Sequence, residues 1–272
     1  MLKSLVNSRF KLISKLYMWL IFFFLYAPLV VLIVFSFNES KSRNVWTGFS
    51  LKWYTKLFAD KEILRALFNT IIVAVVASFL ATVIGTIACF GILKMRRWAK
   101  RSVMNVNNLP IVNPEIVTGV SLMLLFVFAY KNFGIFRPGI VTLIFAHTTF
   151  CLPYVVLSVL PKLRQISPYL YEAAQDLGCT PARAFFKVIL PDIFPGIVTG
   201  FIMAFTLSLD DFVISYFTSG ATQTLPIAIY SMTRKIVSPE INALSTILFA
   251  VVLLLLIAIN LRQIKDEGKN RN

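Results

Sequence analysis

Long apolar segments alternate with shorter polar segments along this chain of 272 residues. Each apolar segment is near the roughly 20 residues that a helix needs to cross a hydrocarbon core. The apolar positions run continuously and do not alternate with polar ones, which disfavours a transmembrane barrel. The pattern therefore predicts an all-α polytopic membrane protein. Its six expected transmembrane helices lie at about residues 18–37, 70–93, 109–130, 139–160, 193–217 and 243–261.

The distribution of basic residues predicts the orientation of these spans. Of the 27 Lys and Arg residues, 10 fall on one side of the spans and 17 on the other, in segments 1–17, 94–102, 161–192 and 262–272. Because Lys and Arg are enriched in cytoplasmic loops, we expect both termini and residues 161–192 to be cytoplasmic.

Segment 38–69 departs from this rule, because it carries six basic residues on the predicted outer side. The stretch WYTKLFADKEILRALF (53–68) is amphipathic, so we expect it to form an interfacial helix. The basic N-terminus resembles a signal peptide, but no small-residue cleavage site follows it, and we expect an uncleaved first span. No linker interrupts the chain, which predicts one domain over residues 1–272 with a core at about 66–262.

Composition narrows the classes of function. Hydrophobic residues make up 58% of the chain, and the net charge of +15 comes mostly from residues that flank the spans. The three cysteines are dispersed, so no metal site is predicted. The single histidine, His147, lies within a span; we expect a hydrogen-bonded packing residue there, with a proton relay as the alternative. The chain has no GxxxxGKS/T motif, so it is not expected to bind ATP itself.

Residues 167–191 lie between two predicted spans but have the pattern of two short soluble helices. Ser167-Pro168 and Thr180-Pro181 are helix-start signals, while Gly178 and Pro191 are stop signals. They predict helices at about 168–177 and 181–190. The first helix has an apolar stripe formed by Leu170, Ala173, Ala174 and Leu177.

Three interpretations of this hairpin compete. It is a plain connection between spans, a DNA-binding helix-turn-helix, or a docking element for a cytoplasmic protein. Residues 167–191 hold two bases and two acids, which gives a neutral surface. Such a surface lacks the electrostatic attraction that dominates binding to nucleic acid, so the DNA interpretation fails.

The hairpin resembles the EAA motif of ABC-importer permeases. The match consists of Glu172-Ala173-Ala174, Gly178 and VILP (188–191), with Val188 where that family usually has isoleucine. The resemblance covers most of the chain, including FSLKWYTKLF (49–58) and Asn69-Thr70. The segments SLDDFVISYFTSG (208–220) and TLPIAIYSM (224–232) resemble more narrowly the spermidine/putrescine permeases.

The resemblance implies the fold of a type I importer permease, and a transport subunit that is not an enzyme and forms half of a pore. It implies that the hairpin docks on a separate ATPase through Glu172, Ala173, Ala174, Leu177 and Gly178. The implied partners are a cytoplasmic ABC ATPase dimer that binds ATP and Mg²⁺, a second homologous permease in a hetero-dimer, and an extracytoplasmic polyamine-binding protein. The implied location is the bacterial cytoplasmic membrane, with lipid around the spans and no nucleic acid or cofactor bound to this chain.

Three acids fall within predicted spans, where an ionisable group is a functional candidate by default: Glu115, Asp210 and Asp211. Gly196, Gly200, Ala204 and Ser208 recur every four residues, so they form a small-residue stripe on the fifth span. On a continuous helix Asp211 falls within this stripe and Asp210 at its edge, while the opposite face is apolar and suits lipid.

We interpret these acids as part of a path for a polycation. Asp210, Asp211, Glu115 and Ser208 are the candidate residues, and Trp46, Tyr216, Phe217 and Tyr230 are candidates for cation–π contacts. Alternatively, the aspartates hydrogen-bond a neighbouring helix or gate the pore, and Glu115 is an acid favoured at a helix start.

Other functions also fit part of the pattern. The chain is alternatively a permease for thiamine, iron or phosphonate, or a self-sufficient cation channel or secondary carrier. Anionic solutes fit less well, because the charges placed inside spans are negative. The absence of obvious inverted repeats weakens the carrier, and a structural scaffold leaves the acids unexplained.

Overall fold

The computed structural model describes residues 2–40, 45–234 and 239–269. Every regular element in these residues is a helix, apart from one isolated bridge between Asn38 and Phe49. The predicted all-α class is therefore confirmed for the described residues. They form two compact units, one of residues 62–230 and the other of residues 1–61 and 231–272. The single domain predicted from the sequence stays a prediction.

The unit of residues 1–61 and 231–272 contains helices α1 (Leu2–Ser36), α2 (Lys52–Ala59) and α12 (Glu240–Lys269). The short helix α2 is anchored by Trp53, whose buried indole Nε1 donates a hydrogen bond of 2.6 Å to the carbonyl oxygen of Asn38. An ion pair between Lys56 and Glu240 joins α2 to the start of α12. These contacts order the polar segment that follows the first apolar helix.

The predicted interfacial helix over residues 53–68 is wrong in its extent. Helix α2 ends at Ala59, because Asp60 has an extended backbone with φ of −80° and ψ of 105°. Asp has low helix propensity, which favours a break there. The second half of the predicted helix instead forms the first turns of α3 (Lys61–Lys94).

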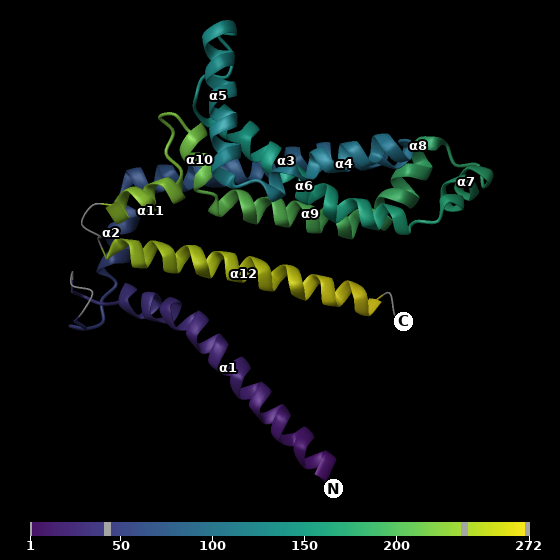
Figure 1. Ribbon diagram of the computed structural model, residues 1–272. Coiled ribbons are helices and arrows are strands. Elements are labelled where there is room, and N and C mark those ends of the chain that lie inside the picture. The colour runs from purple at the N-terminus through teal and green to yellow at the C-terminus, as the bar shows by residue number, and fades with distance from the viewer. Residues whose placement is uncertain (1, 41–44, 235–238, 270–272) are drawn as a thin grey trace. The chain divides into compact units, whose positions relative to one another are not determined.

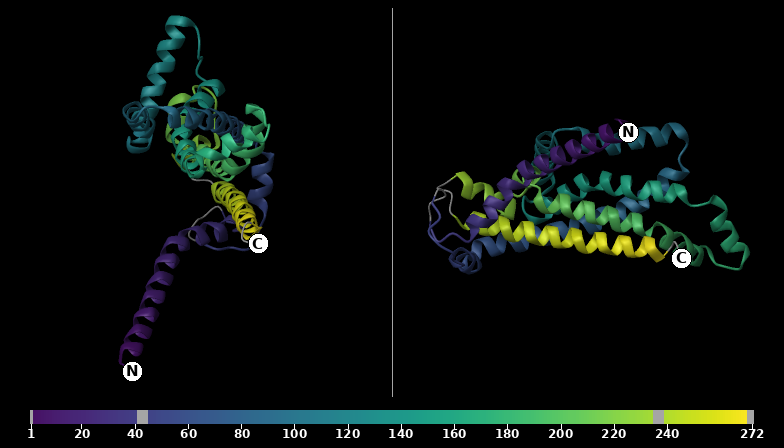
Figure 2. Two further views of the ribbon diagram at one scale, coloured as in Figure 1. Left: turned by 90° about the vertical axis from the view of Figure 1, so that its right-hand side faces the viewer. Right: turned by 90° about the horizontal axis from the view of Figure 1, so that it is seen from below.

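The unit of residues 62–230 is built around the pair α6 (Ile140–Gln165) and α9 (Leu190–Asp210). The right-hand view of Figure 2 shows α9 (green) running beside α6 (teal). The predicted small-residue stripe makes this packing close. A Cβ atom on Gly200 would lie 3.3 Å from the Cα of Val155, and one on Gly196 would lie 3.1 Å from the carbonyl oxygen of Ser158.

All four members of the stripe are buried, which confirms that this face of α9 packs against protein. The core around α6 also takes in α3, where the thiol of Cys89 reaches the carbonyl oxygen of Val156. Burial in this core removes apolar side chains from water. In the part of the protein outside lipid, this burial is the main source of stability. Within lipid, close packing of small residues takes over that role.

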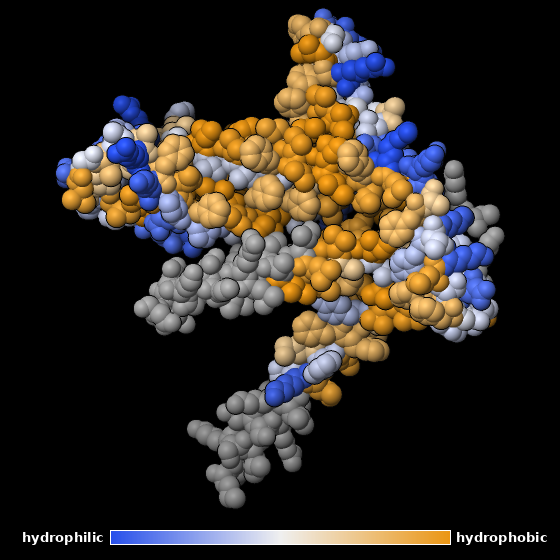
Figure 3. Space-filling view, turned by 180° about the vertical axis from the view of Figure 1, so that it is seen from behind, coloured by the Kyte–Doolittle hydropathy of each residue, from blue (hydrophilic) through white to orange (hydrophobic). Residues whose placement is uncertain are grey.

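Within the described part of the chain, five helices are long and apolar enough to cross a membrane. They comprise residues 14–36, 61–94, 115–133, 140–165 and 181–210. Helix α12 is apolar over residues 240–254, and the second half of the sixth predicted span lies mostly outside the residues whose side chains are described. In Figure 3, apolar side chains cover the middle of the helices of unit 62–230, and polar ones gather at the hairpin end.

The third predicted span, 109–130, is not one helix. Helix α4 (Arg97–Val112) ends at Asn113, and α5 (Glu115–Phe133) starts after Pro114. Proline has no backbone N–H and forces the preceding residue out of the helical region, and Asn113 accordingly has ψ of 144°. The basic stretch 94–102 was expected as a loop, but α4 already begins at Arg97 within it.

The hairpin has its first helix where the sequence predicts it, at α7 (Pro168–Asp176), but its second helix does not stop at Pro191. Helix α8 (Pro181–Ala184) continues through a π-helical turn, η1 (Phe185–Ile189), into α9. The backbone N–H of Leu190 bonds to the carbonyl oxygen of Phe185, five residues earlier. This wider turn lets the helix continue past a residue that cannot donate.

Candidate functional site

The fifth predicted span is interrupted at the two aspartates. Helix α9 ends at Asp210, Asp211 has an extended backbone with φ of −64° and ψ of 121°, and the short helix α10 runs from Val213 to Thr218. Figure 1 shows α10 at the end of the α6–α9 pair opposite to α7. The prediction of one helix over 193–217 is therefore wrong, and no Pro or Gly at the break signals it.

Asp211 is 8% exposed, and its carboxylate is occupied by backbone groups of α10. Its Oδ1 accepts from the N–H of Ile214 at 3.3 Å, and its Oδ2 accepts from the N–H of Ser215 at 2.8 Å. The first N–H groups of a helix have no partner within the helix, so an acidic side chain that accepts from them stabilises the helix start. Asp211 thus begins α10.

His147 connects α6 to both sides of the break. Its side chain is buried at 1% exposure; Nδ1 lies 2.7 Å from the hydroxyl of Ser208 on α9, and Nε2 lies 2.9 Å from the hydroxyl of Ser215 on α10. The Nε2 atom is also 3.5 Å from Oδ2 of Asp211. The prediction of a hydrogen-bonded packing residue is confirmed, and Ser208 belongs to this cluster.

Asp210 has a different environment from its neighbour. Its side chain is exposed, and no basic side chain pairs with it among the described residues. Glu115 begins α5, and one turn later Gly119 packs against Ile214 and Phe217 of α10, the helix that follows Asp210 after the break. The structure therefore brings two of the candidate acids, Asp210 and Glu115, to one region, with Asp211 buried behind them.

Aromatic side chains lie directly after these acids. The ring of Phe212 packs at a tilt of 40° against Tyr230, with centroids 4.5 Å apart, and against Tyr216 at 5.5 Å, and Tyr216 and Tyr230 are 6.4 Å apart. Trp46 belongs to the other unit, where its half-exposed ring packs edge-on against Phe35 at 6.4 Å. The prediction that Trp46 joins the path stays a prediction.

The hairpin presents its candidate docking residues on the surface. Glu172, Ala173 and Gly178 are exposed, and Leu177 is 87% exposed. The predicted apolar stripe is not a buried face, because Ala174 alone among its members is buried while Leu170 is also exposed.

The end of α7 depends on glycine. Gly178 has φ of +86°, a conformation that suits glycine, and the N–H of Cys179 closes the helix on the carbonyl oxygen of Ala174 at 3.1 Å. The Thr180 hydroxyl then caps α8 by accepting from the N–H of Arg183 at 3.4 Å. These local bonds hold the hairpin in one shape although little of it is buried.

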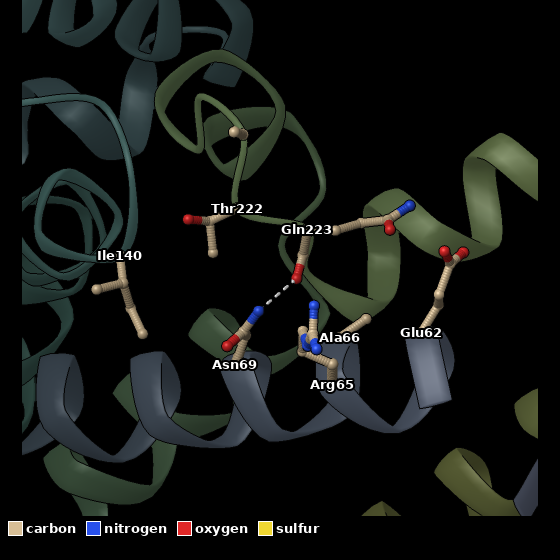
Figure 4. A pocket seen from close by; sticks show the side chains of 8 residues that line it. Glu62, Arg65, Ala66, Asn69, Ile140, Thr222 and Gln223 are labelled. Carbon is tan, nitrogen blue, oxygen red and sulfur yellow. Dashed lines mark hydrogen bonds between the residues drawn. The ribbon is translucent and has the colours of Figure 1, made fainter. Parts of the chain in front are cut away.

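A polar pocket of about 470 Å³ lies at the α10 end of the same unit and was not predicted from the sequence. Figure 4 shows side chains of α3 facing the loop before α11 (Leu225–Arg234), where Asn69 Nδ2 donates to the carbonyl oxygen of Gln223 at 3.0 Å. The next residue, Thr70, accepts from the N–H of Leu225 at 2.7 Å. Asn69 and Thr70 thus anchor this loop. The sequence signal for this role was the resemblance of Asn69-Thr70 to the family pattern. The lining consists of Glu62, Arg65, Ala66, Asn69, Ile140, Ala221, Thr222 and Gln223.

Comparison with known proteins identifies the class of this chain. Residues 81–265 match the family described as "Binding-protein-dependent transport system inner membrane component", so the chain belongs to that family of transporter permeases. Membership makes it a transport subunit and not an enzyme. It also agrees with coupling through the EAA motif, which the sequence indicated.

Individual relatives narrow the comparison. The chain is 41% identical over 234 residues to the putrescine transport system permease protein PotI of Escherichia coli K12, which covers 85% of this chain and 83% of that protein. It is 35% identical over 251 residues to the spermidine/putrescine transport system permease protein PotC of Haemophilus influenzae, over 92% and 95% of the two chains.

A solved structure confirms the fold. The structure of a bacterial alginate ABC transporter in complex with an alginate pentasaccharide-bound periplasmic protein is similar to this chain, with a TM-score of 0.69 over 94% of both chains. At 17% sequence identity this likeness concerns the fold alone. This chain therefore shares its fold with a chain of that ABC transporter.

Proposed function

We propose that the chain is a permease subunit of an ATP-driven importer for polyamines in the bacterial cytoplasmic membrane. The observation that carries the substrate class is the exposed carboxylate of Asp210, which has Glu115 nearby and no basic partner among the described residues. Such a carboxylate favours a cation over an anion or a neutral solute. The permease relatives named for putrescine and spermidine/putrescine support the same class.

The proposed path includes Asp210 and Glu115, with Asp211 and Ser208 on its inner side. A polyamine carries ammonium groups joined by methylene chains, so it matches acids with aromatic surfaces close by. Tyr216 and Tyr230 offer such surfaces within this unit, and Trp46 is a further candidate. Each aromatic face would attract an ammonium group, while the methylene chain packs against the ring.

We also propose that energy reaches the path through the hairpin. Exposed residues of the hairpin, with Glu172 and Leu177 prominent among them, would be covered by a cytoplasmic ATPase, which binds ATP and Mg²⁺ in place of this chain. Two ATPases and a second, homologous permease would complete the transporter, and an extracytoplasmic protein would deliver the polyamine. A binding protein is part of the alginate transporter complex that shares this fold.

The proposed topology has six spans with both termini in the cytoplasm. The asymmetric distribution of Lys and Arg supports it, and so do the five helices among the described residues that are long and apolar enough to span. In this orientation the hairpin lies in the cytoplasm and the two aspartates lie near the outer side, at the far end of α9. A cation from outside would reach Asp210 early in transport.

The decisive experiment is uptake of labelled spermidine and putrescine into vesicles that hold this chain with its proposed ATPase, second permease and binding protein. The expected result is uptake that requires ATP and falls at least about tenfold in Asp210→Asn, because a charge contact to the cation is lost. Asp192→Asn provides a control, since it removes an exposed carboxylate from the opposite end of α9.

Each contrary result has a specific meaning. Uptake without ATP would replace the importer by a self-sufficient channel or secondary carrier. No polyamine uptake by an assembled complex, together with uptake of thiamine or iron, would retain the importer and correct its substrate. Unchanged uptake by Asp210→Asn would remove this acid from the path.

A further inference from the structure

The two adjacent aspartates have such different surroundings that we expect them to have different roles. Both oxygens of the Asp211 carboxylate accept backbone N–H groups of α10, and the side chain is buried. The carboxylate of Asp210 is exposed and has no basic partner among the described residues. A cation that bound Asp211 would have to displace bonds that begin a helix, whereas Asp210 is open to it.

His147 is the second unusual feature at this place. One imidazole on α6 bonds to Ser208 before the break and to Ser215 after it, so it fixes the relative positions of α9 and α10. A second bond acts in the same direction, because Thr142 on α6 donates to the carbonyl oxygen of Thr218 at 2.8 Å. No Pro or Gly breaks the helix here, so these tertiary bonds hold the break open.

We propose that Asp210 is the acid that meets the polycation, and that Asp211 and His147 are positioning residues that hold the helix break which presents Asp210. This inference rests on the proposed polyamine path. It assigns the neighbouring acids separate roles, one as a charge and one as a hydrogen-bond acceptor at a helix start. It also assigns a role in selectivity to a histidine that need not touch the substrate.

The test measures the ratio of the uptake rates for spermidine, with three amines, and putrescine, with two. Both rates are taken in the complete transporter at saturating loaded binding protein and divided by the amount of assembled complex. Losing a carboxylate contact should slow the trivalent cation more than the divalent one, so Asp210→Asn should lower the ratio by about fivefold. A change that merely reduces folding or assembly lowers both rates together and leaves the ratio unchanged.

Substitution by Asn, which removes the charge, distinguishes the roles of the two acids. Asn keeps one acceptor oxygen but replaces the other with an NH2 group, so Asp211→Asn retains one of the two bonds to the start of α10 and should lower the ratio less than Asp210→Asn does. His147→Ala should lower the ratio as Asp210→Asn does, and the double variant His147→Ala/Asp210→Asn should lower it no further, because the two residues act through one contact. His147→Gln, which retains a donor and an acceptor, should restore part of the ratio.

The matched control is Thr149→Ala, two residues from His147 and therefore on another face of α6, where the threonine bonds only to its own helix. If His147→Ala does not assemble, His147→Gln provides the same comparison. A fall in the ratio for Asp211→Asn equal to that for Asp210→Asn would overturn the inference, as would multiplicative effects in the double variant or an unchanged ratio in both His147 variants. An unchanged ratio in Asp210→Asn would show instead that the proposed path is wrong, and the inference falls with it.

Discussion

Two glycines with similar backbones differ in what surrounds them. Gly220 follows α10 and has φ of +57°, and a Cβ atom there would lie 2.9 Å from the carbonyl oxygen of Pro138. Gly134 follows α5 with φ of +69°, and nothing lies within 4 Å of the position of its Cβ. Both conformations favour glycine, but only Gly220 also needs the empty space.

We therefore expect Gly220→Ala to destabilise the assembled transporter more than Gly134→Ala. Each substitution places Ala in the left-handed region, at a cost of about 1–2 kcal/mol. Gly220→Ala adds a clash with backbone atoms of Pro138, which has to be relieved by moving the loop before the pocket. Thermal unfolding in detergent measures the difference, and equal midpoints for the two variants would contradict the close contact.

At the residue scale, the sequence correctly predicted that His147 is hydrogen-bonded, whereas the place predicted for Asp211 on a continuous helix was wrong. A histidine within an apolar segment must find hydrogen-bond partners, which is general and therefore predictable. The role of Asp211 depends on a helix break with no Pro or Gly beside it. Contacts with α6, which is distant in the sequence, set that break. A helical wheel assumes a continuous helix, so it assigned Asp211 to a helix face although Asp211 lies outside both helices.

The turn of the hairpin is stabilised by local bonds, and several of its side chains are exposed. Leu177 and Glu172 are exposed, while Gly178 and Thr180 fix the two turns. Replacing an exposed acid on a protein surface usually changes the free energy of unfolding little. A change in function after such a substitution therefore reports on a partner.

Glu172→Lys should abolish ATP-dependent uptake and reduce recovery of the ATPase with the purified permease at least about tenfold, because it reverses a charge in the proposed interface. Insertion into the membrane should stay normal. Asp192→Lys makes the same change in charge on an exposed acid outside the hairpin and should bind the ATPase normally. Normal recovery with Glu172→Lys would argue against docking through this helix.

At the scale of elements, the sequence located helices better than it located their ends. The spacing of Gly196, Gly200, Ala204 and Ser208 correctly identified the packed face of α9, because small residues every four positions bring two helices together. Proline was less informative. Pro114 separates two helices, whereas Pro191 is accommodated by a π-helical turn, and local sequence does not distinguish these outcomes.

The whole-molecule orientation can be tested with the cysteines of the native chain. Cys179 lies half-buried in the turn of the hairpin, while Cys89 and Cys151 are fully buried. A membrane-impermeant maleimide should therefore label the chain from the cytoplasmic side alone, and Cys179→Ser should abolish the labelling. Added ATPase should reduce the rate of labelling at least about tenfold, since a docked surface excludes the reagent.

Labelling of intact cells from outside would reverse the proposed orientation. Labelling that persists in Cys179→Ser would instead show that Cys89 or Cys151 becomes accessible during transport. Equal rates with and without ATPase would leave the orientation intact but contradict docking at the hairpin.

The class of the whole molecule was predictable, because membrane-spanning length, basic flanks and the EAA motif are all local in sequence. The family match and the shared fold agree with it. The arrangement of the acids was not predictable in the same way. Glu115 and Asp210 are brought together from different helices, and a pocket formed by α3 with the loop after α10 depends on packing that no single segment encodes.

The continuity of the helix past Pro191 has a mechanical consequence. Residues 181–210 form one rod of 30 residues, about 45 Å long, that begins in the hairpin and ends at Asp210. In the proposed coupling, a tilt of the hairpin is transmitted along this helix to the carboxylate, and the π-helical turn and Pro195 are the points where the helix can bend. The proposed docking site of the ATPase and the carboxylate of Asp210 lie at opposite ends of one helix, so the backbone itself connects them without a relay through side chains.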